Sequence, residues 1–488
     1  MKLKSASKFE KTAARCWNLL NEGKPFTPIF VIGTMTIFHF QGLLHGEWFS
    51  FLISLLFTLP LFILYFYYDF PLFLRNYLWI PVIGFLLLFE PPNLALWGLG
   101  IGLYFFFTVF FWGTFYYHLR IGTDWLNFTR FWKLVLKNSD STSGNAQEQL
   151  PKFLLLLAVW DGMMTNLATG ELLPTTQYFI FCGGVFALAF ILHHFLFDWK
   201  PNQYDSFTTG EPAHEEAQNE KVMVIVIDGM RKERFYEANT PFLDGLMERG
   251  TEYLNMETVY PARTVVCFSS MFTGTYPKEH GMKSNMVWKL GIKVESIFDS
   301  LRKVGKKGKM LGIAHLVDSF GKDVETVTAV MHKDKADRNI INKAKKIMEE
   351  QDPDLFIVQL IGTDQIGHSR GVLYDEYIEK IEEADRLIQE YVEWLESEGK
   401  MENTTLMICA DHGQADGIGG HGHLDEGERF VPFFMVGPGI KKGEKIQEKR
   451  SLVSMAPTIA YLLGAPYPSH SRGPVLNEAL KESWKQHE

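Results

Sequence analysis

Apolar residues are distributed unevenly along this chain. From about residue 25 to residue 198, Phe, Leu, Ile and Trp occur in long runs. The helices that these runs predict lack the polar face of a soluble helix, which favours a lipid bilayer as their surroundings. From residue 200 onward, short β-branched runs alternate with amphipathic, charged stretches. The pattern therefore predicts a membrane half followed by a soluble half.

The first half contains six candidate membrane spans, since a helix needs roughly 20 apolar residues to cross the hydrocarbon core. The candidates are 27–46, 48–68, 76–90, 94–117, 153–168 and 175–197. The second, fourth and sixth fit best. The fifth is the weakest because it contains Asp161, which we expect near a helix end or in a hairpin that does not fully span. The alternative is a functional carboxylate within the membrane.

Positive charge orients this half. Basic residues gather in the first 24 residues and in the loop 118–152, so both are expected in the cytoplasm. Six full spans would leave the soluble half in the cytoplasm, whereas five would place it outside. The sequence leaves both alternatives open because the count depends on segment 153–168.

Composition sets the domain organisation. We expect a basic cytoplasmic tail (1–24), a multi-pass membrane domain (25–198), a polar linker (199–220) and a catalytic domain (221–488). The residues after Lys200 carry 46 acidic and 35 basic side chains, which argues against a nucleic-acid-binding surface. The 4 cysteines are scattered, so neither a disulfide framework nor a zinc knuckle is indicated.

The soluble half has the alternation of a doubly wound, mostly parallel α/β sheet. The expected strands are 222–227, 308–313, 354–360, 404–410 and 431–436. The expected helices are 240–249, 264–273, 295–304, 337–350, 374–398 and 453–463. Ligands of such folds lie beyond the carboxyl ends of the strands.

Three aspartates, Asp228, Asp364 and Asp411, follow three of these strands. A single aspartate in this position is usually a helix N-cap. Because parallel strands end at the same edge of a sheet, we expect the three carboxylates to converge. Together they predict a functional site.

Histidines and one threonine complete the set. His368 and His412 accompany Asp364 and Asp411, and His421 follows shortly afterwards, with His423 as the alternative to it. Three carboxylates, three imidazoles and the hydroxyl of Thr264 can hold two divalent metals with a nucleophile on them. These ligand types suit zinc, and manganese is the alternative. Taken alone, Thr264 would be the N-cap of helix 264–273, and His280 and His315 are interpreted as structural.

The motifs of this half resemble a known family. They are Asp228-Gly-Met-Arg231, Asn239-Thr-Pro-Phe-Leu243, the segment from Thr264 through His280-Gly-Met-Lys-Ser-Asn285, Asp364-Gln-Ile-Gly-His368 and Asp411-His-Gly413. Over about 222 to 465 they are similar to the type I phosphodiesterase/nucleotide pyrophosphatase group of the alkaline phosphatase superfamily. The resemblance does not cover the membrane half.

The resemblance implies roles for these residues. Thr264 would be the nucleophile, and Asn285 would help to bind the phosphate oxygen. One zinc would be held by Asp364, His368 and a later histidine, for which we choose His421. The other would be held by Asp228, Asp411, His412 and Thr264 itself.

The chain departs from many members of this group in the spacing of the last histidine. In many nucleotide pyrophosphatases it lies roughly a hundred residues after the Asp-His pair, but here Gly420-His-Gly-His423 follows closely. This spacing looks more like the lipid-anchor ethanolamine-phosphate transferases and related bacterial membrane phosphodiesterases. The substrate is therefore open.

The expected function is a membrane-anchored, two-zinc phosphodiesterase or phosphotransferase that acts through a phospho-Thr264 intermediate. Water as acceptor would give a hydrolase, and an alcohol of a lipid or glycan would give a transferase. The membrane half favours a lipid-linked phosphodiester as donor or acceptor. The alternatives are a non-catalytic membrane scaffold that retains the fold and a metal-dependent phosphoglycerate mutase.

Overall fold

The computed structural model describes residues 23–484 except 45, 69, 71, 119–121, 131, 133–145, 171, 198–200, 210–218, 286–290, 328–334 and 417–419. Contacts divide the chain into two compact units: one contains residues 201–488, and the other contains residues 17–118 and 124–200. Most of the expected cytoplasmic tail and much of the expected linker lie outside the described residues.

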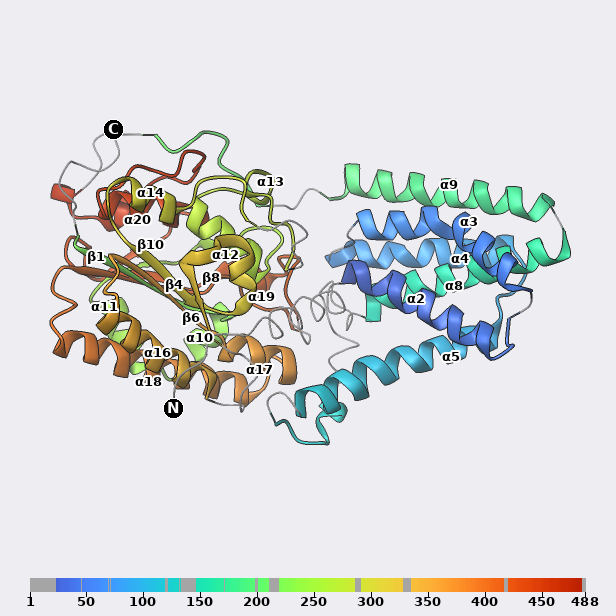
Figure 1. The fold of residues 1–488 in the computed structure, drawn as a ribbon, viewed down its shortest axis with the longest axis horizontal. Coiled ribbons are helices and arrows are strands. Elements are labelled where there is room, and N and C mark those ends of the chain that lie inside the picture. The colour runs from blue at the N-terminus through green and yellow to red at the C-terminus, as the bar shows by residue number, and fades with distance from the viewer. Residues whose placement is uncertain are drawn as a thin grey trace. The chain divides into compact units, whose positions relative to one another are not determined.

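The N-terminal unit is helical (Figure 1). Its elements are α2 (Gly23–Phe40), α3 (Trp48–Tyr67), η1 (Leu72–Leu78), α4 (Trp79–Leu88), α5 (Leu94–Phe105), η2 (Phe106–Tyr116), α8 (Ala146–Thr169) and α9 (Leu172–Phe195). Within the described residues, three helices are long and apolar enough to cross a membrane: Trp48–Tyr67, Leu94–Tyr116 and Thr175–Phe195. They correspond to the three candidates that fit best in the sequence.

Helix α8 occupies the centre of this unit, where it packs against α2, α3, α4, α5 and α9. Its burial by other helices explains why it tolerates charge: Glu148 and Lys152 form an ion pair in which each side chain is only 2% exposed. The indole of Trp160 donates a hydrogen bond to the hydroxyl of Ser54 at 2.9 Å. Asp161 lies inside α8 and not near its end, so the first of our two expectations for it was wrong; the second, a hairpin that does not fully span, stays a prediction.

The C-terminal unit is built on an eight-stranded sheet in the order β10-β2-β9-β7-β1-β6-β4-β5. Pairing is parallel throughout except for β9, which is antiparallel to both β2 and β7. The strands are β1 (Lys221–Ile227), β2 (Thr251–Tyr253), β4 (Gly308–Gly312), β5 (Val324–Thr326), β6 (Leu355–Leu360), β7 (Thr404–Cys409), β9 (Phe433–Val436) and β10 (Glu444–Ile446). A second sheet, in the order β11-β3-β8, contains β3 (Met256–Glu257), β8 (Phe430–Val431) and β11 (Arg450–Ser451).

Helices cover both faces of the large sheet (Figure 1). On one face, α18 (Asp375–Ser397) packs against α11 (Pro241–Glu248) and α16 (Ala336–Glu350). On the other, α20 (Met455–Leu462) packs against α12 (Thr264–Thr273) and α14 (Ile297–Lys303). Apart from Lys221 at the start of β1 and Gln359 in β6, these two central strands are apolar, as expected for strands buried on both faces. The predicted doubly wound, mostly parallel α/β fold is thus confirmed.

Candidate metal centre

Three neighbouring strands position the aspartates. Strands β7, β1 and β6 are adjacent and parallel, so their carboxyl ends lie at one edge of the sheet. Asp228 directly follows β1, and Asp411 follows β7 after one residue. Asp364 lies in the first turn of α17 (Gly362–Arg370), which begins shortly after β6. The expected convergence therefore follows from strand order.

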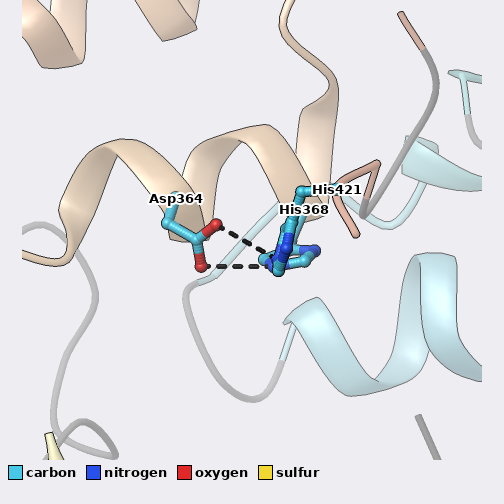
Figure 2. Close-up of side chains that lie close together, drawn as sticks. All are labelled: Asp364, His368 and His421. Atoms are coloured by element: carbon cyan, nitrogen blue, oxygen red, sulfur yellow. Dashed lines mark hydrogen bonds and ion pairs between the residues drawn. The ribbon is translucent and has the colours of Figure 1, made fainter. Parts of the chain in front are cut away.

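The first group of side chains consists of Asp364, His368 and His421. Asp364 and His368 are one turn apart on α17, and His421 reaches them from a loop (Figure 2). Nε2 of His368 lies 3.2 Å from Oδ2 of Asp364, and Nε2 of His421 lies 3.8 Å from Oδ1. The two Nε2 atoms are 3.2 Å apart. We call these residues the Asp364 group.

The second group consists of Asp228, Asp411 and His412, all fully buried. Nε2 of His412 lies 3.5 Å from Oδ1 of Asp228 and 3.4 Å from Oδ2 of Asp411. The rings of His412 and His421 are stacked with centroids 4.1 Å apart, so the two groups are neighbours. We call this set the Asp228 group.

Backbone carbonyls fix the orientation of two of the imidazoles. Nδ1 of His421 donates to the carbonyl of Ala262 at 2.8 Å, and Nδ1 of His412 donates to that of Gly413 at 2.9 Å. In a neutral ring the remaining nitrogen, Nε2, then carries a lone pair. A histidine that binds a metal through one ring nitrogen usually donates the N–H of its other ring nitrogen to such an acceptor.

The electrostatics of the two groups differ. Burial raises the pKa of Asp228, and the carboxylates of Asp411 and Asp364 raise it further. Burial also raises the pKa of Asp411. Burial opposes the ionisation of Asp364, yet the imidazoles of His368 and His421 bring its pKa below the usual range. Ionised Asp228 and Asp411 would therefore repel each other, and a divalent cation would relieve that repulsion.

The residues fit a pair of metal ions. Oδ1 of Asp228 and Oδ2 of Asp411 are buried without a hydrogen-bond partner among the described residues. Burying such an atom is costly unless something coordinates it. The donor set of carboxylate oxygens and imidazole nitrogens is one that zinc accepts.

Thr264 and Asn285 lie beside the Asp228 group. Thr264 is the first residue of α12, with Arg263 at the N-cap, one residue away from the N-cap position expected for the threonine. Its hydroxyl oxygen lies 3.3 Å from Nε2 of His412. Oδ1 of Asn285 accepts the backbone N–H of Val265 at 3.0 Å, which leaves its amide nitrogen as the donor end.

The other histidines are arranged differently. His423 is buried next to Tyr260, with ring centroids 6.5 Å apart, and among the described residues it belongs to neither metal group. His280 is buried and hydrogen-bonded to Ser270 and to the N–H of Met282. That environment suits the structural role expected for His280.

Sequence reasoning missed two glutamines. Gln359 and Gln414 are both fully buried and donate to Asp228 and Asp364 respectively. Gln359 has a visible signal, because it is the one polar residue of an otherwise apolar strand, β6. Gln414 directly follows the Asp411-His-Gly413 motif, but nothing in the sequence shows where its side chain points.

Comparisons with known proteins bear on this unit. The profile of the family "Type I phosphodiesterase / nucleotide pyrophosphatase" matches residues 222–432. The human GPI ethanolamine phosphate transferase 2 catalytic subunit is 25% identical over 52% of this chain and 27% of its own length. The human GPI ethanolamine phosphate transferase 3 catalytic subunit is 31% identical over 30% of this chain and 13% of its own length. The matched part thus spans about a quarter or less of these relatives.

Solved structures also resemble this chain. Murine ectonucleotide pyrophosphatase / phosphodiesterase 5 aligns over 54% of this chain and 100% of its own, with 14% identity and a TM-score of 0.46. The alkaline phosphatase PafA aligns over 56% of this chain and 100% of its own, with 12% identity and a TM-score of 0.47.

The family match includes Asp228, Asp364 and Asp411 together with Thr264, and its range ends inside the large C-terminal unit. Within the C-terminal unit, residues 222–432 of this chain therefore match the type I phosphodiesterase / nucleotide pyrophosphatase family.

Proposed function

We propose that the C-terminal unit is a two-metal phosphodiesterase or phosphotransferase with Thr264 as its nucleophile. The observation that carries this proposal is the position of the Thr264 hydroxyl beside the Asp228 group, which adjoins the Asp364 group; the side chains of both groups could hold a metal ion. The Asp364 group would hold one ion, and the Asp228 group with Thr264 would hold the other. Zinc fits this ligand set best.

The first half of the reaction joins substrate and protein. When bound, the ions would supply positive charge that lowers the pKa of the Thr264 hydroxyl and polarises the phosphoryl group. The Thr264 oxygen attacks phosphorus, the bond to the leaving alcohol breaks, and a phosphothreonine ester forms. Asn285 donates its amide N–H to a phosphate oxygen, and the N-terminus of α12 favours the negative charge there.

In the second half, the threonine ester is cleaved by water or by an alcohol, which regenerates Thr264. The printed names of the relatives favour an alcohol acceptor and ethanolamine phosphate as the transferred group. A membrane-spanning N-terminal unit fits a lipid-linked donor or acceptor, because it anchors the C-terminal unit to the bilayer. We therefore favour transfer of ethanolamine phosphate from a lipid.

The N-terminal unit is proposed to be a multi-pass membrane domain. Three helices are long enough to span, and the shorter apolar helices Pro25–Phe40 and Phe73–Leu88 accompany them. Protease added to sealed cells would cut near residues 199–220 if the C-terminal unit is outside. A tag at residue 1 that stays protected in the same cells would then exclude six full spans.

Metal content tests the centre. The full chain, purified in detergent and analysed by inductively coupled plasma mass spectrometry, should carry about two divalent ions. His368→Ala and Asp411→Asn should each lose about one ion, because each removes a ligand from a different group. His423→Ala is the matched control and should retain both. A wild-type chain that binds no divalent ion in the presence of excess zinc would refute the proposal.

A further inference from the structure

The three aspartates of the two metal groups share one arrangement. Each carboxylate has one oxygen held by an N–H donor of the protein and another oxygen facing a histidine. Asp411 shows it with a backbone donor: its Oδ1 accepts from the N–H of Gly229 at 3.1 Å, and its Oδ2 lies 3.4 Å from Nε2 of His412. For the other two aspartates, the donor is a buried glutamine.

Gln359 holds Asp228. Its amide nitrogen donates to Oδ2 of Asp228 at 2.6 Å, while Oδ1 of the same carboxylate faces His412. Its own amide oxygen accepts the N–H of Ile313 at 2.9 Å. Both ends of the amide are therefore hydrogen-bonded. If the amide flipped, its oxygen would face the carboxylate oxygen of Asp228, so the orientation is fixed. A Cβ at Gly312 would lie 2.6 Å from that amide oxygen, so the neighbouring strand leaves room for the glutamine.

Gln414 holds Asp364. Its amide nitrogen donates to Oδ1 of Asp364 at 2.8 Å, while Oδ2 lies 3.2 Å from Nε2 of His368. The side chain is packed between a glycine of helix α17 and a glycine of the turn after β1: a Cβ at Gly367 would lie 1.9 Å from it, and a Cβ at Gly229 would lie 2.9 Å from it. Gly229 also has φ +64°, which a side chain would strain. The surrounding backbone is thus shaped around this amide.

We infer that Gln359 and Gln414 are positioning residues: Gln359 positions the Asp228 group, and Gln414 positions the Asp364 group. A fully buried amide is costly unless its hydrogen bonds are satisfied. Gln359 is engaged at both ends, whereas Gln414 is held through its amide nitrogen alone, and its amide oxygen has no hydrogen-bond partner among the described residues. Gln359 occupies one oxygen of Asp228 and leaves the other facing His412. Gln414 binds the Asp364 oxygen that lies nearer His421 and leaves the other oxygen facing His368. The inference rests on the proposed metal centre and adds that the two sites are tuned separately.

The experiment isolates one site at a time. In the Asp411→Asn background the Asp364 group is the remaining site, and in the His368→Ala background the Asp228 group remains. Gln359→Met and Gln414→Met, which keep volume and remove the donor, are placed in each background. Metal-free full-length proteins are then titrated with cobalt(II), and the visible absorption bands report occupancy and ligand geometry. Gln365→Met is the control: Gln365 neighbours Asp364 but makes no side-chain hydrogen bond to either group among the described residues.

Selective effects are expected. Gln414→Met should raise the cobalt dissociation constant by about 10–100-fold in the Asp411→Asn background and leave the other background unchanged. Gln359→Met should show the opposite selectivity. A general structural role would instead weaken both sites alike. Equal weakening of both backgrounds, or none in either, would overturn this inference. Wild-type protein that binds fewer than two ions would overturn the metal centre itself.

Discussion

The hydroxyl oxygen of Thr264 lies 3.3 Å from Nε2 of His412, although the two residues are 148 positions apart in the sequence. Thr264 begins helix α12, and His412 follows strand β7. Nδ1 of His412 donates to the Gly413 carbonyl, so Nε2 is the atom turned toward the threonine. A candidate nucleophile and a candidate metal ligand therefore face each other in a buried site.

Substrate charge should discriminate between diesters and monoesters. Asn285 offers a neutral donor, whereas the additional charge of a monoester would favour an arginine clamp. We expect a higher kcat/KM for bis(nitrophenyl) phosphate than for nitrophenyl phosphate. Asn285→Ala should lower the diester rate and leave metal content unchanged. A tenfold or greater preference for the monoester would contradict the diesterase assignment.

The pH dependence of stability should depend on His280. Burial lowers the pKa of His280 to about 3 from a usual value of 6.5. Between these values the unfolded chain binds a proton that the folded chain does not, so stability falls as the pH drops from 6.5 toward 3. The slope is about 1.4 kcal/mol per pH unit for one proton.

His280→Gln should reduce that slope. The measurement is urea unfolding of the metal-free protein at a series of pH values, since metal release would otherwise add its own pH dependence. The same slope in wild type and variant would show that His280 is not the responsible group.

The ion pair inside α8 predicts a stability effect in the N-terminal unit. Lys152→Met leaves the buried carboxylate of Glu148 without its cation and should destabilise the unit by about 3–5 kcal/mol. Combining it with Glu148→Gln removes both charges and should recover most of the loss. Thermal unfolding in detergent measures both. A single variant as stable as wild type would show that the pair is not required.

The strand-end aspartates illustrate what local sequence reveals. Asp228, Asp364 and Asp411 each follow a recognisable apolar strand, and parallel pairing brings such positions to one edge. The choice between His421 and His423 had no such support, because it depends on a loop whose course is set by distant contacts. One of these is the backbone carbonyl of Ala262, 159 positions away in the sequence, which accepts the Nδ1–H of His421 at 2.8 Å.

Other features of the fold could not be predicted from the sequence either. Strands β2, β5 and β10 have 3 residues each, too few to show a period. Segment 153–168 looked like a marginal span because hydropathy cannot distinguish a helix in lipid from one surrounded by other helices. In the structure α8 packs against other helices; its Glu148 and Lys152 are buried, and Asp161 is half-buried.

The central claim is that Thr264 carries the phosphoryl group during turnover. Wild-type protein is mixed with a phosphodiester, quenched in acid within the first turnover, digested and analysed by mass spectrometry. We predict that the peptide containing Thr264 gains the mass of the transferred phosphoryl group. Thr264→Ser should retain part of the activity, and Thr264→Ala should show neither the adduct nor turnover while keeping most of its metal. An adduct on another residue, or wild-type turnover by Thr264→Ala, would contradict the account.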